Sequence, residues 1–100
     1  MANPKIKNPI TDKLVSALLC LKNEDECYRL IEDLCTIREI QDLAQRLEVA
    51  GMLRRHITYN EIAQTTGVST ATISRVNRSL SYGEGGYDMV LDRMAEAKHD

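Results

Sequence analysis

Residues 58–80, TYNEIAQTTGVSTATISRVNRSL, restrict the possible folds of this 100-residue chain more than any other segment. Thr58 can cap a helix N-terminus, and Glu61, three residues later, completes a capping-box pattern. Gly67 stands where this helix has to end, because glycine adopts a positive φ without steric cost. Ser69 is a second N-cap residue. The segment is therefore predicted to form two short helices joined by a tight turn.

The apolar residues of this segment are spaced so that the two helices can pack on each other. Ile73, Val76 and Leu80 fall on one stripe of the second helix. The residues expected to form the shared core are Ile62, Ala63, Val68, Ile73 and Val76. This is the helix-turn-helix pattern, whose second helix lies in the DNA major groove. The alternative is a helical hairpin inside some other kind of domain.

The opposite face of the second helix carries short hydroxyl groups, a methyl group and arginines. Such side chains can approach base edges closely, and arginine binds guanine or phosphate. Asp and Glu are absent from residues 67–80, which suits a surface that faces phosphates. The residues predicted to lie at bases or at adjacent phosphates are Thr70, Ala71, Ser74, Arg75 and Arg78.

The charge of the chain is unevenly distributed. Residues 1–50 carry seven Lys and Arg against nine Asp and Glu, and residues 81–100 carry two against five. Residues 51–80 carry four arginines against one acidic residue. A basic island on an acidic chain favours sequence-selective DNA binding over general attraction to nucleic acid. Arg54 and Arg55 belong to this island, and we predict that they contact phosphates.

The remainder of the chain is predicted to be helical, giving an all-α fold with about six helices. Residues 1–8 are expected to be a flexible arm, and residues 9–100 a single domain. Pro9, Asn23 and Thr36 mark the starts of three helices, the last of which extends to about residue 54. The glycines of SYGEGGY predict a turn before a final helix. Gly51 lies inside the long helix, and close packing against a neighbour would explain it.

The helices of residues 9–54 carry more apolar surface than one small subunit can cover, which predicts an obligate dimer. Cys20, Cys27 and Cys35 form no CxxC pair, and we expect them to be reduced core residues that bind no metal. The sequence has no apolar leader and no run of membrane length. A cytoplasmic protein with no membrane partner is therefore expected.

Residues 36–80 resemble the Trp repressor superfamily, and more closely the small TrpR-related YerC/YecD group of bacterial regulators. The most specific part of this resemblance is MLRRHITYNEIAQTTGVSTATISRVNRSL, followed by the SYGEGGY turn. The resemblance implies a six-helix subunit that folds only as an intertwined dimer. In such a dimer the outer helices form a shared core, and the two helix-turn-helix units project from it.

The resemblance also implies a candidate effector pocket, because the repressor holds tryptophan between two arginines. Arg46 and Arg75 match these arginines, with Arg46 depending on a one-residue gap, and Ser79 matches a serine of the recognition helix. Val76 stands in place of the glycine against which the indole packs, so tryptophan is not expected to be the effector. Arg46 is alternatively a solvated residue on a long helix.

The predicted function is a homodimeric transcriptional regulator of the repressor type, bound to a palindromic double-stranded DNA operator. Tyr59 and Asn60 match positions that contact the DNA backbone in the family, although they could equally be ordinary first-turn residues. The alternative function is a sigma-region-4-like or accessory module of a transcription complex. An enzyme is not expected, because His56 and His99 lack catalytic partners and no glycine-rich phosphate loop is present. No catalytic residue and no cofactor are therefore predicted.

Overall fold

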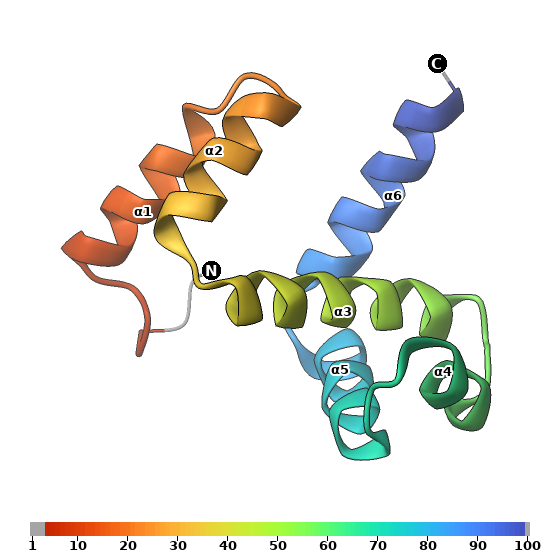
Figure 1. Cartoon of the computed structure of the whole chain (residues 1–100). Helices are drawn as coiled ribbons and strands as arrows, with labels where there is room; N and C mark the ends of the chain where they lie inside the picture. Colours follow the sequence, from red (N-terminus) through yellow and green to blue (C-terminus); the bar gives the residue numbers. More distant parts are fainter. Residues whose placement is uncertain (1–3, 100) are drawn as a thin grey trace. The chain divides into compact units, whose positions relative to one another are not determined.

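The computed structural model describes residues 4–99 and contains six α-helices and no strand within that range (Figure 1). The helices are α1 (Pro9–Leu19), α2 (Glu24–Leu34), α3 (Ile37–Arg54), α4 (Tyr59–Thr66), α5 (Thr70–Tyr82) and α6 (Gly86–His99). The all-α prediction is confirmed, including the bounds of the long helix. The chain divides into two compact units, Met1–Ile40 and Gln41–Asp100. None of the described helices is long and apolar enough to cross a membrane.

Each predicted N-cap residue accepts a hydrogen bond from the backbone N–H three residues later. The side chains that do so are Asn8, Asn23, Thr36, Thr58 and Ser69, with donor–acceptor distances between 2.8 and 3.2 Å. These bonds satisfy donors that the first turn of a helix would otherwise leave unpaired. The helix starts are therefore specified locally by the sequence.

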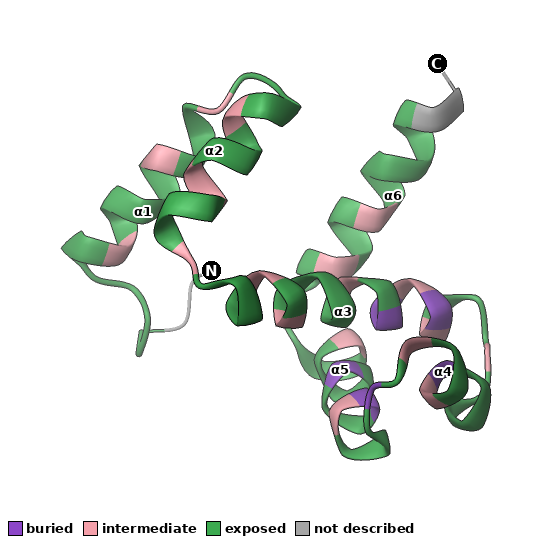
Figure 2. Cartoon of the chain, viewed as in Figure 1, coloured by how far each residue is buried: buried purple, intermediate pink, exposed green. Residues whose placement is uncertain are grey.

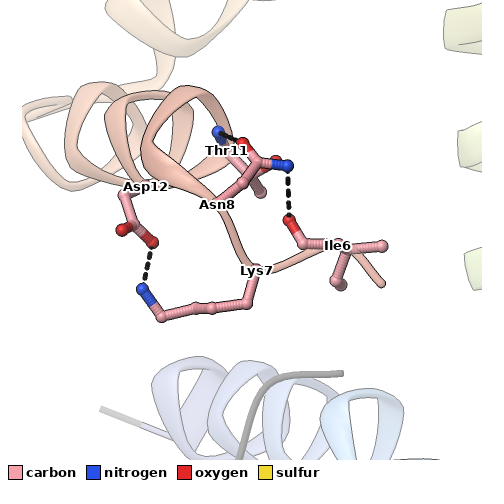
Figure 3. A network of polar contacts seen from close by, with 5 residues as sticks. All are labelled: Ile6, Lys7, Asn8, Thr11 and Asp12. Carbon is pink, nitrogen blue, oxygen red and sulfur yellow. Dashed lines mark hydrogen bonds and ion pairs between the residues drawn. The ribbon is translucent and has the colours of Figure 1, made fainter. Parts of the chain in front are cut away.

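The start of α1 shows how the described part of the predicted arm meets the first helix (Figure 3). Asn8 accepts from the Thr11 N–H at 2.8 Å and donates its own amide to the Ile6 carbonyl at 3.3 Å. Lys7 forms an ion pair with Asp12 in the first turn of α1. Residues 1–3 lie outside the described part of the chain, and the flexibility of the arm stays a prediction.

The capping boxes at the starts of α3 and α4 differ in how fully they form. At the start of α3, Thr36 accepts from the Glu39 N–H at 3.1 Å, and the Glu39 carboxylate accepts from the Thr36 N–H at 2.8 Å. The second bond is the main reason that the pKa of Glu39 lies below its ordinary value. At the start of α4, Thr58 accepts from the Glu61 N–H, but among the described residues the return bond is not formed. The capping box predicted for Thr58 is therefore only half present.

Two helices, α3 and α4, are followed by a left-handed residue, and the sequence indicated the one after α4. Gly67 ends α4 with φ 75°, and its N–H donates to the Ala63 carbonyl at 2.9 Å. His56 follows α3 with φ 62°, which is unusual for a residue that has a Cβ. The His56 N–H donates to Leu53 and the Ile57 N–H to Met52, which together make a Schellman cap. The chain thus turns sharply from α3 into the helix-turn-helix.

The core of the second unit joins α4 and α5 to the C-terminal part of α3 (Figure 2). Its buried residues are Val49, Ala50, Met52, Ile62, Val68, Ile73 and Val76. Tyr87 and Leu91 of α6 pack against the same cluster. The predicted contacts between the two short helices are confirmed, with Ala63 only half-buried at their crossing.

The first unit lacks such a core, since α1 and α2 contain no buried residue. Cys20 and Cys27 are exposed and Cys35 is half-buried, with all three thiols free. The expectation that these cysteines lie in the core is therefore wrong for a single subunit. The reason is that the described chain supplies no apolar layer to cover this part of the molecule.

The explanation expected for Gly51, close packing against a neighbour, is not found within one subunit. A Cβ built on Gly51 meets no atom within 4 Å, so no neighbour in the subunit requires a glycine at this point of α3. Gly83 is different, because a Cβ there would lie 2.3 Å from the Ser79 carbonyl oxygen. The close approach that demands glycine is thus found at the end of α5.

The left-handed turn at Gly67 leads to the first prediction. Gly67→Ala should lower the free energy of unfolding by about 1–2 kcal/mol, because a Cβ at this positive φ is strained. Gln64→Ala, at an exposed position of α4, should change it by no more than about 0.5 kcal/mol. Urea denaturation of both variants provides the measurement. Equal values for the two would contradict the assignment of Gly67 as the residue that sets the turn.

Candidate nucleic-acid interface

Helix α5 has a buried face and an exposed face, as the sequence predicted. Ile73 and Val76, with exposed fractions of 0% and 2%, face the core of the second unit. The residues predicted to meet DNA are all exposed: Thr70, Ala71, Ser74, Arg75 and Arg78. The helix therefore presents hydroxyl, methyl and guanidinium groups on its exposed face, while its opposite face is packed in the core.

The turn before α5 is held by hydroxyl groups on both sides of Gly67. Thr66 donates to the Ile62 carbonyl at 2.7 Å and accepts from the Val68 N–H at 3.2 Å. Ser69 accepts from the Thr72 N–H at 3.2 Å. Thr66 was not singled out by the sequence, although a threonine at the end of a helix can bond back to the carbonyl four residues earlier. These bonds fix where the first turn of α5 begins.

The residues predicted to contact the DNA backbone lie at the junction between α3 and α4. Arg55 follows the last residue of α3 and is exposed, and it forms no ion pair with any described residue. Tyr59 and Asn60 form the first turn of α4 and are also exposed. Their exposure suits contact with phosphates and equally suits ordinary first-turn residues, so their role stays a prediction.

Arg54 differs from the other predicted contacts because acidic residues of α6 bind its side chain. Its Nε lies 3.3 Å from an oxygen of Asp88, and its Nη2 lies 2.5 Å from an oxygen of Asp92. The hydrogen bond to Asp92 is the main reason that the pKa of Arg54 is raised above its ordinary value. Asp88 and Asp92 stand four residues apart and therefore share one face of α6, but this spacing does not identify Arg54 as their partner.

The structure brings together two of the four residues expected in the effector pocket. Arg75 and Ser79 line a depression of about 370 Å³ at the end of α5, together with Arg78, Tyr82 and Gly83. Every one of these lining residues is exposed, so the depression is open rather than enclosed. Arg46 is exposed on α3 and does not line it, and Val76 lies in the core.

A second hollow, of about 560 Å³, is apolar and lies within the same unit. Its lining residues come from α3, α5, the glycine-rich turn and α6, and they are Leu47, Ser79, Gly83, Glu84, Gly86, Tyr87 and Val90. Among the described residues, no three His, Cys, Asp or Glu side chains are grouped as metal ligands would be. The chemistry that the second unit offers is therefore recognition by arginine, hydroxyl and apolar groups.

Comparison with known proteins identifies the arrangement. The model of the family described as Trp repressor protein matches residues 10–95. The chain belongs to the Trp repressor family. It is 55% identical over 94 residues to the uncharacterized protein YerC of Bacillus subtilis strain 168, covering 94% of this chain and 90% of YerC.

Two solved structures of Trp repressor-like proteins have the same fold. A TrpR-like protein from Eubacterium eligens ATCC 27750 is 57% identical with a TM-score of 0.89, covering 93% of this chain and 96% of that one. A candidate Trp repressor from Staphylococcus aureus is 50% identical with a TM-score of 0.89, covering 95% of each chain. As a member of the Trp repressor family, the protein is a DNA-binding transcription regulator.

Val76 stands at the position where the resemblance to the repressor implies a glycine beneath the indole of tryptophan. The apolar spacing of the second helix predicted that Val76 lies in the core. The structure places its side chain inward, in the same cluster as Ile62 and Ile73. Position 76 therefore supports the helix-turn-helix and adds no wall to a ligand site.

Proposed function

We propose that the protein is a homodimeric, sequence-specific transcriptional regulator of the repressor type that binds a palindromic operator through α5. The observation that carries this proposal is the exposed face of α5, whose hydroxyl groups and arginines lie opposite a fully buried apolar face. Asp and Glu are absent from residues 67–80, so no carboxylate of this segment would repel phosphates.

In this proposal each exposed group has a stated role. Thr70, Ala71 and Ser74 lie at base edges, and Arg75 and Arg78 bind guanine or adjacent phosphates. Arg55, in the loop before α4, contacts the DNA backbone, and so do Tyr59 and Asn60 in the first turn of α4. These contacts set the register of the protein on DNA without reading the sequence themselves.

The proposal of a homodimer rests on apolar surface that one subunit leaves uncovered. Leu14, Val15 and Leu18 of α1 are all at least 40% exposed, and no residue of α1 or α2 is buried. Leu43 of α3 and Val90 of α6 are similarly uncovered. Surface of this kind in a small domain is usually covered by a second copy. A two-fold dimer would place two recognition helices at half-sites about one helical turn apart.

We further propose that tryptophan is not the effector. The depression beside Arg75 is lined by exposed residues and is open, so it does not enclose an indole ring. Val76 is held in the core, so making room at this position would require repacking of Ile62 and Ile73. A regulator without this effector would respond to its own concentration.

The uncovered apolar surface predicts that a charge within it prevents folding. Leu18→Glu or Leu43→Glu should abolish the folded state, because these leucines, 45% and 52% exposed in one subunit, would be buried in the dimer. Lys13→Glu on α1 is the matched control and should leave the dimer intact. Circular dichroism and sedimentation measure both properties. A well-folded monomer at micromolar concentration, for either the native chain or a leucine variant, would contradict the proposal.

The exposed face of α5 predicts that its arginines contribute selectively to DNA binding. Arg75→Ala or Arg78→Ala should cost about 1–3 kcal/mol at the preferred site and relax the preference for one base pair. Arg55→Ala should weaken binding to every sequence alike. Lys22→Ala removes one positive charge outside the helix-turn-helix and serves as the control. Fluorescence anisotropy at several salt concentrations provides the measurement, and equal affinity of the native chain for all DNA sequences would refute the proposal.

The buried position of Val76 predicts the outcome of a titration with L-tryptophan. Forcing an indole into this part of the helix-turn-helix should cost at least about 1–3 kcal/mol, as overpacking of a core does. Calorimetry of the purified protein should therefore show no saturable binding with a Kd below about 100 µM. Saturable heat in that range, together with tighter operator binding, would show that tryptophan is the effector after all.

A further inference from the structure

Arg54 makes three contacts with two successive turns of α6. Its Nε and Nη2 bind the carboxylates of Asp88 and Asp92, and its Nη1 donates to the backbone carbonyl of Asp88 at 3.4 Å. All three nitrogen atoms of the guanidinium are engaged, which the planar fork of arginine permits and a lysine could not reproduce. The side chain of Arg54 is 32% exposed, so these contacts are only partly open to solvent.

These contacts adjoin the apolar contact between α6 and the helix-turn-helix core. Leu53, the neighbour of Arg54, packs against the buried cluster, and so do Tyr87 and Leu91 of α6. The preceding connection contains Gly83, Gly85 and Gly86, of which Gly85 has a positive φ. Because glycines restrict the backbone so little, this connection alone does not fix the direction in which α6 leaves α5. The contacts of Arg54, Tyr87 and Leu91 supply that constraint.

A phosphate group that approached Arg54 would also approach the carboxylates of Asp88 and Asp92, which already pair with the guanidinium and would repel the phosphate. Arg55, the next residue, has no such acidic partner among the described residues. The two adjacent arginines thus have opposite electrostatic surroundings, although the sequence predicts the same role for both.

We propose that Arg54 is a positioning residue, which clamps α6 to the end of α3 beside the helix-turn-helix core, and is not a contact to DNA phosphate. One consequence of this inference, that Arg55 contacts DNA phosphate while Arg54 does not, rests on the proposed DNA-binding function. Its other consequence, the coupling of Arg54 to α6, does not depend on DNA.

The test compares Arg54→Ala with Arg55→Ala in the full-length protein by two measurements. The first is the slope of log K against log salt concentration for a random-sequence duplex. Each phosphate contact contributes about 0.9 to this slope, so Arg55→Ala should reduce its magnitude by about 1.8 for a dimer that binds through both subunits. Arg54→Ala should leave the slope unchanged.

The second measurement is amide hydrogen exchange in α6. Arg54→Ala and Asp92→Asn should each speed exchange in this helix, and the double variant should add little to either single effect, because both remove the same contact. Arg55→Ala should leave exchange in α6 unchanged. If Arg54→Ala does not fold, Arg54→Lys, which keeps the charge and loses the fork, should speed exchange in α6 with an unchanged slope.

Two results would overturn the inference. One is that Arg54→Ala reduces the slope of log K against log salt concentration as much as Arg55→Ala does. The other is unchanged exchange in α6 when Arg54 or Asp92 is replaced. If neither Arg55→Ala nor Arg75→Ala altered DNA binding, the proposed function would fail, while the exchange measurement would still decide whether Arg54 clamps α6.

Discussion

The packing of Ile62 against Ile73 and Val76 is the contact on which the rest of the second unit depends. Ile62 and Ile73 have no exposed surface, and they join α4 to α5 over the residues Val49 and Met52 of α3. Because this cluster fixes the rotation of α5 about its own axis, it determines which side chains face outward. A shift of the apolar stripe by one residue would turn Val76 toward solvent and Arg75 toward the core. The reading face is therefore a consequence of the buried face.

The two units of the chain stand in different physical situations. The second unit buries a small apolar core of its own, which extends from α3 to α6. The first unit has amphipathic helices with well-formed caps and no buried residue. Capping specifies where α1 and α2 begin, but it contributes only about 0.5–2 kcal/mol per cap and cannot replace burial of an apolar face. The proposed dimer would supply that burial and would make folding and assembly a single event.

Much of the fold could be predicted from the sequence because its signals are local. Asn8, Ser69 and Gly67 act within three or four residues of their own positions, and α3 has the bounds that its caps and apolar spacing predicted. The exposure of the outer face of α5 could be predicted in the same way, since it follows from the spacing of the apolar residues, while the contact of this face with DNA stays a prediction. The core position of Val76 follows from the same spacing, because Ile73, Val76 and Leu80 form one stripe of the helix.

The features that the sequence did not predict involve residues distant in the chain. The pairing of Arg54 with Asp88 and Asp92 spans 34 to 38 residues, so no local pattern reports it. The open space at Gly51 and the exposure of Cys20 depend equally on which elements pack nearby. Sequence periodicity indicates which residues are apolar, but it does not indicate whether the covering surface comes from the same subunit.

The central claim is that two copies of this chain present two α5 helices to one palindromic site. Hydroxyl-radical footprinting on a duplex that the purified protein has selected from a random pool tests this claim most directly. The account predicts a protection pattern with two-fold symmetry, centred on two half-sites about 10–10.5 base pairs apart. Protection of one asymmetric site, or a footprint that forms only when another transcription protein is present, would contradict it and would favour an accessory module.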